Sequence, residues 1–230
     1  MPFKGLDQRQ TFTLIMEVDE AVALANCGLR SLAELHHIDE EYAAVLTLLS
    51  IASEKLLKTV IGLAELDAGR SWPTVKVMKD YGHHITRLDR DARRIYSNQL
   101  DRAAAPPYLT ELLADCEAGN VLTGMLDALE HWADRGRFHR LDELAGKPQP
   151  GETAQAMWQA LENQVAERDT ELAAMLGTVE RYDQVRDRIN HALRESYLRW
   201  WQLHWRAWAH GVIGDDACGL SVALGRLAGT

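Results

Sequence analysis

Apolar residues recur at spacings of three and four through most of the chain, which is the period of an amphipathic α-helix. No alternation of apolar and polar residues with a period of two persists beyond a few positions, so we expect no β-strand. The longest regular run lies between about residues 38 and 66. Its apolar positions are Tyr42, Val45, Leu46, Leu49, Ala52, Leu56, Val60 and Leu63. This pattern predicts the central buried helix of an all-α protein.

Further helices are predicted on both sides of this run. The first extends from about Gln10 to Ala25, with Gly28 as its stop signal. The others are expected at about 85–100, at 108–132 with an interruption near Gly119-Asn120, at 152–176 and at 178–211. Proline-containing segments at 103–107 and 147–151 mark breaks. The pattern predicts one all-α domain over residues 1–230, an antiparallel helical bundle in which 101–177 is an inserted or accessory segment.

The last predicted helix is rich in aromatic residues. Tyr197, Trp201, Trp205 and Trp208 share one stripe, whereas Trp200 and His204 form a four-residue pair on another side. Aromatic residues beside arginines can stack nucleic-acid bases. An aromatic stripe at helical spacing is more typical of a core or a dimer interface. Two aromatic faces predict that this helix is covered on more than one side.

Charge is unevenly distributed along the chain. The formal net charge is -9, which argues against a protein whose whole surface binds nucleic acid. Between residues 181 and 206, however, six arginines stand against three acidic residues, a local excess of three positive charges. The sequence therefore predicts a local basic patch.

Other features narrow the class of protein. The three cysteines are far apart, which argues against a disulfide framework and a zinc ribbon. We see no leader peptide and no apolar run long enough to span a bilayer, so we expect a cytoplasmic protein without membrane contact. No phosphate-binding loop, dinucleotide fingerprint or nucleophile elbow is present, which excludes the commonest enzyme classes.

The run from Arg186 to His191 suggests a site that cleaves phosphodiesters. Asp187 and His191 are four residues apart and share a helix face, so the carboxylate can orient the imidazole. Arg186 would bind a phosphate with its planar guanidinium. It lies five positions from His191, roughly 140° around an ideal helix, so the two would converge more easily across a two-fold dimer. The alternative is that these residues form ordinary surface ion pairs.

The run Arg186-Asp187-x-x-x-His191 resembles the signature of ribonucleases in the HEPN superfamily of small helical domains. Two other segments are similar to that superfamily, namely Ser53-Glu54-Lys55-Leu56-Leu57-Lys58 and Gly82-His83-His84-Ile85-x-x-Leu88. The resemblance covers residues 38–100 and 178–212. It implies a homodimeric up-and-down bundle that cuts RNA without a metal, as a toxin or an anti-phage effector. Some relatives are inactive and serve as binding modules.

We therefore expect a metal-independent endoribonuclease of a toxin or defence system, which needs no cofactor. His191 would exchange protons with the ribose 2′-hydroxyl or the leaving oxygen, Arg186 would stabilise the transition state, and Asp187 would orient His191, leaving a 2′,3′-cyclic phosphate. The expected RNA-binding residues are Arg188, Arg194, Arg199 and Arg206. The expected partners are a second copy of the chain, RNA, and an antitoxin or other protein of the system.

Two other functions stay open. The first is a non-catalytic interaction or dimerisation module, in which the aromatic helix is an interface. The second is a metal-binding bundle, for which the candidate ligands are Glu34, His36, His37, Glu40, Glu41, His83 and His84.

The segment 136–141 is basic and aromatic. It is either a loop that reaches over a site or a surface connection with Phe138 and Leu141 tucked inward.

Overall fold

The structure, a computed structural model, is all-α: the residues it describes contain no strand. It describes the backbone of residues 2–36, 38–175 and 179–228, and the side chains of 2–36, 41–175 and 180–227. The helices are α1 (Gln8–Ala33), α2 (Ile38–Asp67), α3 (Val75–Asp80), α4 (Ile85–Ser97), α5 (Pro106–Ala118), α6 (Asn120–Asp134), α7 (His139–Leu144), α8 (Ala154–Arg168), α9 (Thr170–Met175), α10 (Tyr182–Ala209) and α11 (Asp215–Ala228), with 3-10 turns at Leu100–Arg102, Gly136–Phe138 and Val179–Arg181.

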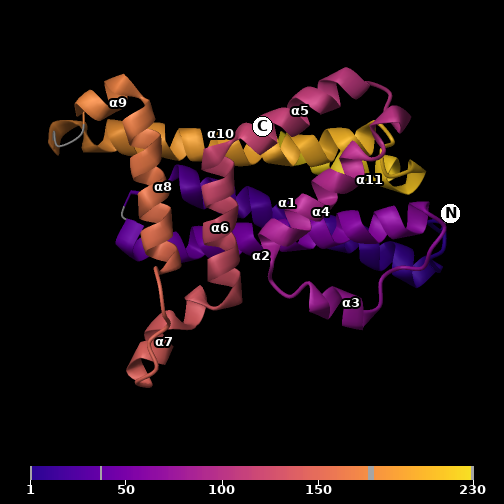
Figure 1. Ribbon diagram of the computed structural model, residues 1–230, viewed down its shortest axis with the longest axis horizontal. Helices are drawn as coiled ribbons and strands as arrows, with labels where there is room; N and C mark the ends of the chain where they lie inside the picture. Colours follow the sequence, from indigo (N-terminus) through magenta and orange to yellow (C-terminus); the bar gives the residue numbers. More distant parts are fainter. Residues whose placement is uncertain (1, 37, 176–178, 229–230) are drawn as a thin grey trace.

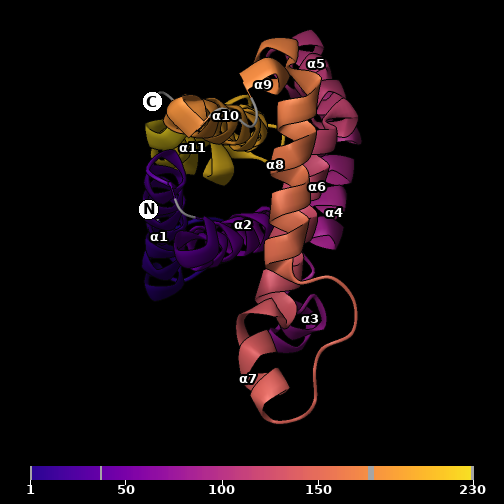
Figure 2. The same cartoon turned by 90° about the vertical axis from the view of Figure 1, so that its left-hand side faces the viewer.

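The helices form two layers. Helices α1, α2, α10 and α11 run along the long axis of the molecule (Figure 1). Figure 2, which looks along these helices, shows α4, α5, α6 and α8 side by side as a second layer. Buried apolar residues from both layers belong to one continuous cluster. The segment 101–177 supplies part of this core, for example Leu126 and Trp158.

Most of the predicted helices are confirmed, although the short helices α3 and α7 were not predicted and other segments also differ. Helix α1 continues to Ala33, so the prediction that Gly28 ends it was wrong. Gly28 instead allows close packing, since a Cβ atom there would lie 2.6 Å from Leu49. The run at 152–176 is divided by Asp169, which caps α9 by accepting from the amides of Glu171 and Leu172. The C-terminal segment that follows Gly214 forms a further helix, α11.

Helix α7 projects away from both layers (Figures 1 and 2). Phe138 is 49% exposed and Leu141 is 62% exposed, so the interpretation that these side chains are tucked inward was wrong. The short helix is connected to α6 by the 3-10 turn Gly136–Phe138. Within the described residues, no helix is both long and apolar enough to cross a membrane.

Helix α10 is covered on several sides, as its two aromatic faces predicted. Tyr197, Trp200, Trp201 and Trp208 are fully buried. Their polar edges are satisfied by other helices: Trp200 donates to Asp89 (2.7 Å) and Trp201 to the Leu224 carbonyl (3.1 Å). Trp208 donates to the hydroxyl of Tyr96, which lies 2.9 Å from His204 Nδ1. These contacts fix α10 against α4 and α11.

His204 should make the stability of the fold depend on pH. Burial, aided by the charge of Arg93, lowers its pKa to about 3, and its Nε2 atom has no hydrogen-bond partner. In the unfolded chain this histidine has an ordinary pKa of about 6.5, so below that pH it binds a proton. In the folded protein it stays neutral in the same pH range. The free energy of unfolding should therefore fall by about 1 kcal/mol between about pH 7 and pH 5.5 on account of this residue.

Urea unfolding followed by tryptophan fluorescence at the two pH values measures this effect. In a His204→Gln variant the fall should be smaller than in the wild type by that amount, because the variant cannot titrate there. Equal pH dependence in the two proteins would show that His204 is not buried in its neutral form.

Candidate functional site

Arg186 is buried in an ion pair between α10 and α8. Arg186 is 6% exposed. Its Nη2 atom lies 2.9 Å from Oε1 of Glu162, and its Nη1 atom lies 3.1 Å from Oε2. Trp158 also donates to Glu162, at 3.1 Å. Such a two-pronged contact uses the same edge of the guanidinium that would bind a phosphate. Arg186 is therefore already occupied by a carboxylate.

The ion pair carries a desolvation cost. Burial raises the pKa of Glu162, although the charge and hydrogen bonds of Arg186 and the hydrogen bond of Trp158 act in the opposite direction. Removing one member of such a pair leaves the other as an uncompensated buried charge. The arrangement indicates a structural role for Arg186 within the contact between α8 and α10.

Asp187 and His191 lie on the exposed side of α10, away from Arg186. No hydrogen bond or ion pair joins them among the described side chains. His191 borders two hollows of about 390 and 350 Å³. One contains Arg168 and Arg188, and the other contains Arg30 and Arg194. The structure therefore brings His191 together with two of the predicted RNA-binding arginines but separates it from Arg186.

Each of the four predicted RNA-binding arginines already contacts another side chain. Arg188 contacts Asp169 at 2.6 Å, and Arg194 contacts Glu195 at 3.7 Å. Further along α10, Arg199 pairs with Asp115 of α5 at 3.0 Å. Arg206 lies over the rings of Trp205 and Tyr108 at 4.0 and 5.8 Å from their centroids. Arg199 and Arg206 thus belong to the contact with α5, at a distance of two or more helical turns from His191.

The candidate metal ligands do not gather within the described residues, where no three histidine, cysteine, aspartate or glutamate side chains lie close enough to hold a metal ion. His37 and the side chain of Glu40 lie outside the described part of the chain. Glu41 accepts from the backbone amide of His36 at 2.9 Å. His84 lies 3.6 Å from Glu130 of α6.

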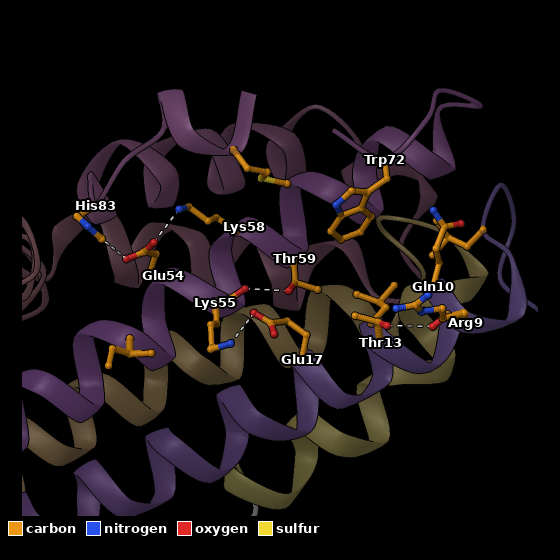
Figure 3. Close-up of a pocket in the computed structure, with 14 residues that line it drawn as sticks. Arg9, Gln10, Thr13, Glu17, Glu54, Lys55, Lys58, Thr59, Trp72 and His83 are labelled. Carbon is orange, nitrogen blue, oxygen red and sulfur yellow. Dashed lines mark hydrogen bonds and ion pairs between the residues drawn. The ribbon is translucent and has the colours of Figure 1, made fainter. Parts of the chain in front are cut away.

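A cavity of about 680 Å³ opens between α1, α2 and the segment 72–83 (Figure 3). Apolar side chains form much of its wall, namely Leu6, Leu14, Ile51, Trp72 and Met78. The remaining lining residues are polar or charged and comprise Arg9, Gln10, Thr13, Glu17, Glu54, Lys55, Lys58, Thr59 and His83. The cavity therefore combines an apolar wall with polar and charged groups.

Trp72 closes one end of this cavity by lying directly on the backbone of α2. A Cβ atom on Gly62 would lie only 2.3 Å from the indole ring, so glycine is needed at this position for the close approach. Figure 3 shows the ring directed from its loop toward α1 and the cavity. Trp72 follows Gly69 and precedes Pro73, in a segment whose composition predicts a loop and gives no sign of a binding role.

The opposite end of the cavity is built from residues of the segments 53–58 and 82–88. Glu54 accepts from Lys58 at 2.7 Å and lies 2.8 Å from His83 Nδ1. Lys58 also donates to the Gly82 carbonyl at 2.9 Å. These contacts bind α2 to the turn that precedes α4 and hold the three side chains in one cluster (Figure 3).

Lys55 lies between the two ends of the cavity and is also paired (Figure 3). It donates to Glu17 at 2.7 Å and to Glu20 at 3.2 Å on α1. Burial opposes its charge, but the hydrogen bonds and charges of these two carboxylates outweigh burial and raise its pKa. Lys55 therefore remains charged and links α1 to α2.

Comparison with models of known protein families, with curated proteins and with solved structures finds no match for this chain. The assignment of a function therefore depends on the geometry of the two sites described above.

The buried ion pair predicts a specific stability pattern. Arg186→Ala should lower the free energy of unfolding by about 3–5 kcal/mol, because Glu162 would be left buried without its partner. The double variant Arg186→Met, Glu162→Gln should recover most of this loss, since it removes both buried charges and keeps an amide oxygen that can accept from Trp158. Chemical unfolding of the three proteins measures both effects. A stable Arg186→Ala protein would contradict the structural role.

Proposed function

We propose that this protein is a non-catalytic binding module and that its ligand site is the cavity between α1, α2 and residues 72–83. The observation that carries the proposal is the cavity itself, a pocket of about 680 Å³ that combines an apolar wall with polar and charged groups. Pockets of roughly 300–1,000 Å³ with this composition typically hold small organic ligands. The ends of the cavity are held by Trp72 on Gly62 and by the Glu54 cluster, which favours a preformed site.

The state of Arg186 supports a binding function over catalysis at the Arg186–His191 run. An arginine that stabilises a phosphate must be accessible to it, whereas Glu162 already occupies this one. A two-fold dimer would not change that contact, because both residues belong to the same chain and are buried within it.

Metal-free cleavage of RNA is the second candidate function. The observation in its favour is that His191 is exposed between two hollows that contain Arg168, Arg188 and Arg194. In this reading, His191 transfers protons and neighbouring arginines take the role first expected of Arg186. A homodimer, an antitoxin or other system protein as partner, and a cytoplasmic location would belong to this toxin or defence function.

Filling the cavity tests the binding function. Ile51→Trp places a large ring in the cavity from a partly exposed position, so the core should remain intact. The fluorescent probe 8-anilinonaphthalene-1-sulfonate should bind the wild type saturably at one site, and Ile51→Trp should weaken this binding roughly tenfold or more. Val222→Trp is the matched control, because Val222 is an exposed apolar residue on α11 outside the cavity. Identical titrations of all three proteins would refute the proposal.

Cleavage of a mixed RNA pool in excess EDTA tests the second candidate. Under the binding function, the wild type and His191→Ala should both leave the RNA intact. Cleavage by the wild type that is lost in His191→Ala would establish the ribonuclease instead. His191→Ala is preferable to Arg186→Ala here, because the exposed histidine can be replaced without disturbing the core.

A further inference from the structure

The charges around the cavity are unequally paired. Three cationic side chains of lysine or arginine line it, namely Arg9, Lys55 and Lys58. Lys55 is paired with Glu17 and Glu20, and Lys58 with Glu54. Among the side chains that the structure describes, no carboxylate lies within ion-pair distance of Arg9, which is exposed at the start of α1. Arg9 is thus available to an anion from outside the chain.

Arg9 and Trp72 lie at the same end of the cavity. Figure 3 shows Arg9 and Gln10 near Trp72, with the His83, Glu54 and Lys58 cluster at the other end. Gln10 uses its side-chain oxygen to accept from the Asp7 amide at 2.9 Å, which leaves its NH₂ group as a further donor. One end of the cavity therefore presents a flat aromatic ring, an available guanidinium and an amide donor.

The carboxylates of the cavity do not favour a cationic ligand. Glu54 already accepts from Lys58 and contacts His83, and Glu17 accepts from Lys55. The charge of each of these carboxylates is already offset by a cation, whereas no described carboxylate lies close enough to offset the charge of Arg9, so the cavity favours a ligand anion over a ligand cation. An apolar body would cover the wall formed by Ile51, Met78 and Trp72.

We propose that the cavity takes an apolar, preferably aromatic, molecule that carries one carboxylate, with its ring against Trp72 and its carboxylate on Arg9. This inference rests on the proposed binding function and names the chemical class of its ligand. The recognition is additive, since the apolar wall supplies most of the affinity and the single guanidinium selects the anion.

Three probes of similar size and different charge test this proposal, namely 6-phenylhexanoate, 6-phenylhexan-1-ol and 6-phenylhexan-1-amine. Their binding to the full-length protein is measured by isothermal titration calorimetry or, for weak binding, by ligand-detected NMR. The carboxylate should bind about fivefold more tightly than the alcohol, as expected of one exposed ion pair, and the amine should bind most weakly.

Two variants locate the source of the selectivity. Arg9→Gln should remove the preference for the carboxylate over the alcohol and leave the binding of the alcohol unchanged. Arg140→Gln is the matched control, because Arg140 is an exposed arginine on α7 outside the cavity, and it should retain the preference. Gly62→Ala should weaken all three probes, because its Cβ displaces Trp72.

The outcomes separate this inference from the proposed function. Equal binding of acid and alcohol, or tightest binding of the amine, would overturn the carboxylate assignment while the cavity remained a binding site. A preference that survives Arg9→Gln would overturn the role of Arg9. Absence of binding by all three probes, together with an unaltered dye titration in Ile51→Trp, would overturn the binding function itself.

Discussion

The whole arrangement depends on the burial of α10 between the other helices. A helix with four fully buried aromatic side chains is stable only when each indole N–H or hydroxyl finds a partner inside the protein. Asp89, Tyr96 and the Leu224 carbonyl supply these partners from α4 and α11. Because these partners come from both layers, the packing of α10 fixes how the two layers meet. Helix α2 is held against α10 by a hydrogen bond between the hydroxyls of Ser53 and Tyr197, which lie 3.0 Å apart.

The same central position determines what the Arg186–His191 run can do. Two residues five positions apart face directions roughly 140° apart around a helix. On a helix covered along most of its length, one of them faces a neighbour while the other faces solvent. Arg186 faces α8 and finds Glu162, whereas His191 remains exposed. The separation follows from helical geometry, and the buried carboxylate converts Arg186 from a candidate catalytic group into part of the core.

Much of the fold was predictable from sequence because it depends on local periodicity. The regular spacing that begins at Tyr42 predicted α2 closely, and the two aromatic faces of the last long helix predicted its central position. Gly28 shows the limit of this reasoning. A glycine serves as a helix stop or as a site of close packing, and only the position of Leu49 on the neighbouring helix distinguishes the two roles.

The site was predictable only in part, because it depends on contacts between distant segments. The segments 53–58 and 82–88 were recognised through a resemblance, and they do meet at one end of the cavity. Trp72 and Arg9 gave no local signal, since their role depends on the backbone of Gly62 and on the absence of a nearby carboxylate among the described side chains. The partner of Arg186 was equally hidden, 24 residues away on another helix.

The most direct test of the account is to locate a bound ligand by NMR. The protein has seven tryptophans, so a ¹H–¹⁵N spectrum contains only seven indole N–H signals. The signal that disappears in Trp72→Phe is the one from the cavity. On addition of 6-phenylhexanoate, the Trp72 indole signal should shift while those of the buried Trp200 and Trp201 remain in place. A shift confined to residues around His191, with Trp72 unaffected, would contradict the account and place ligand binding on α10.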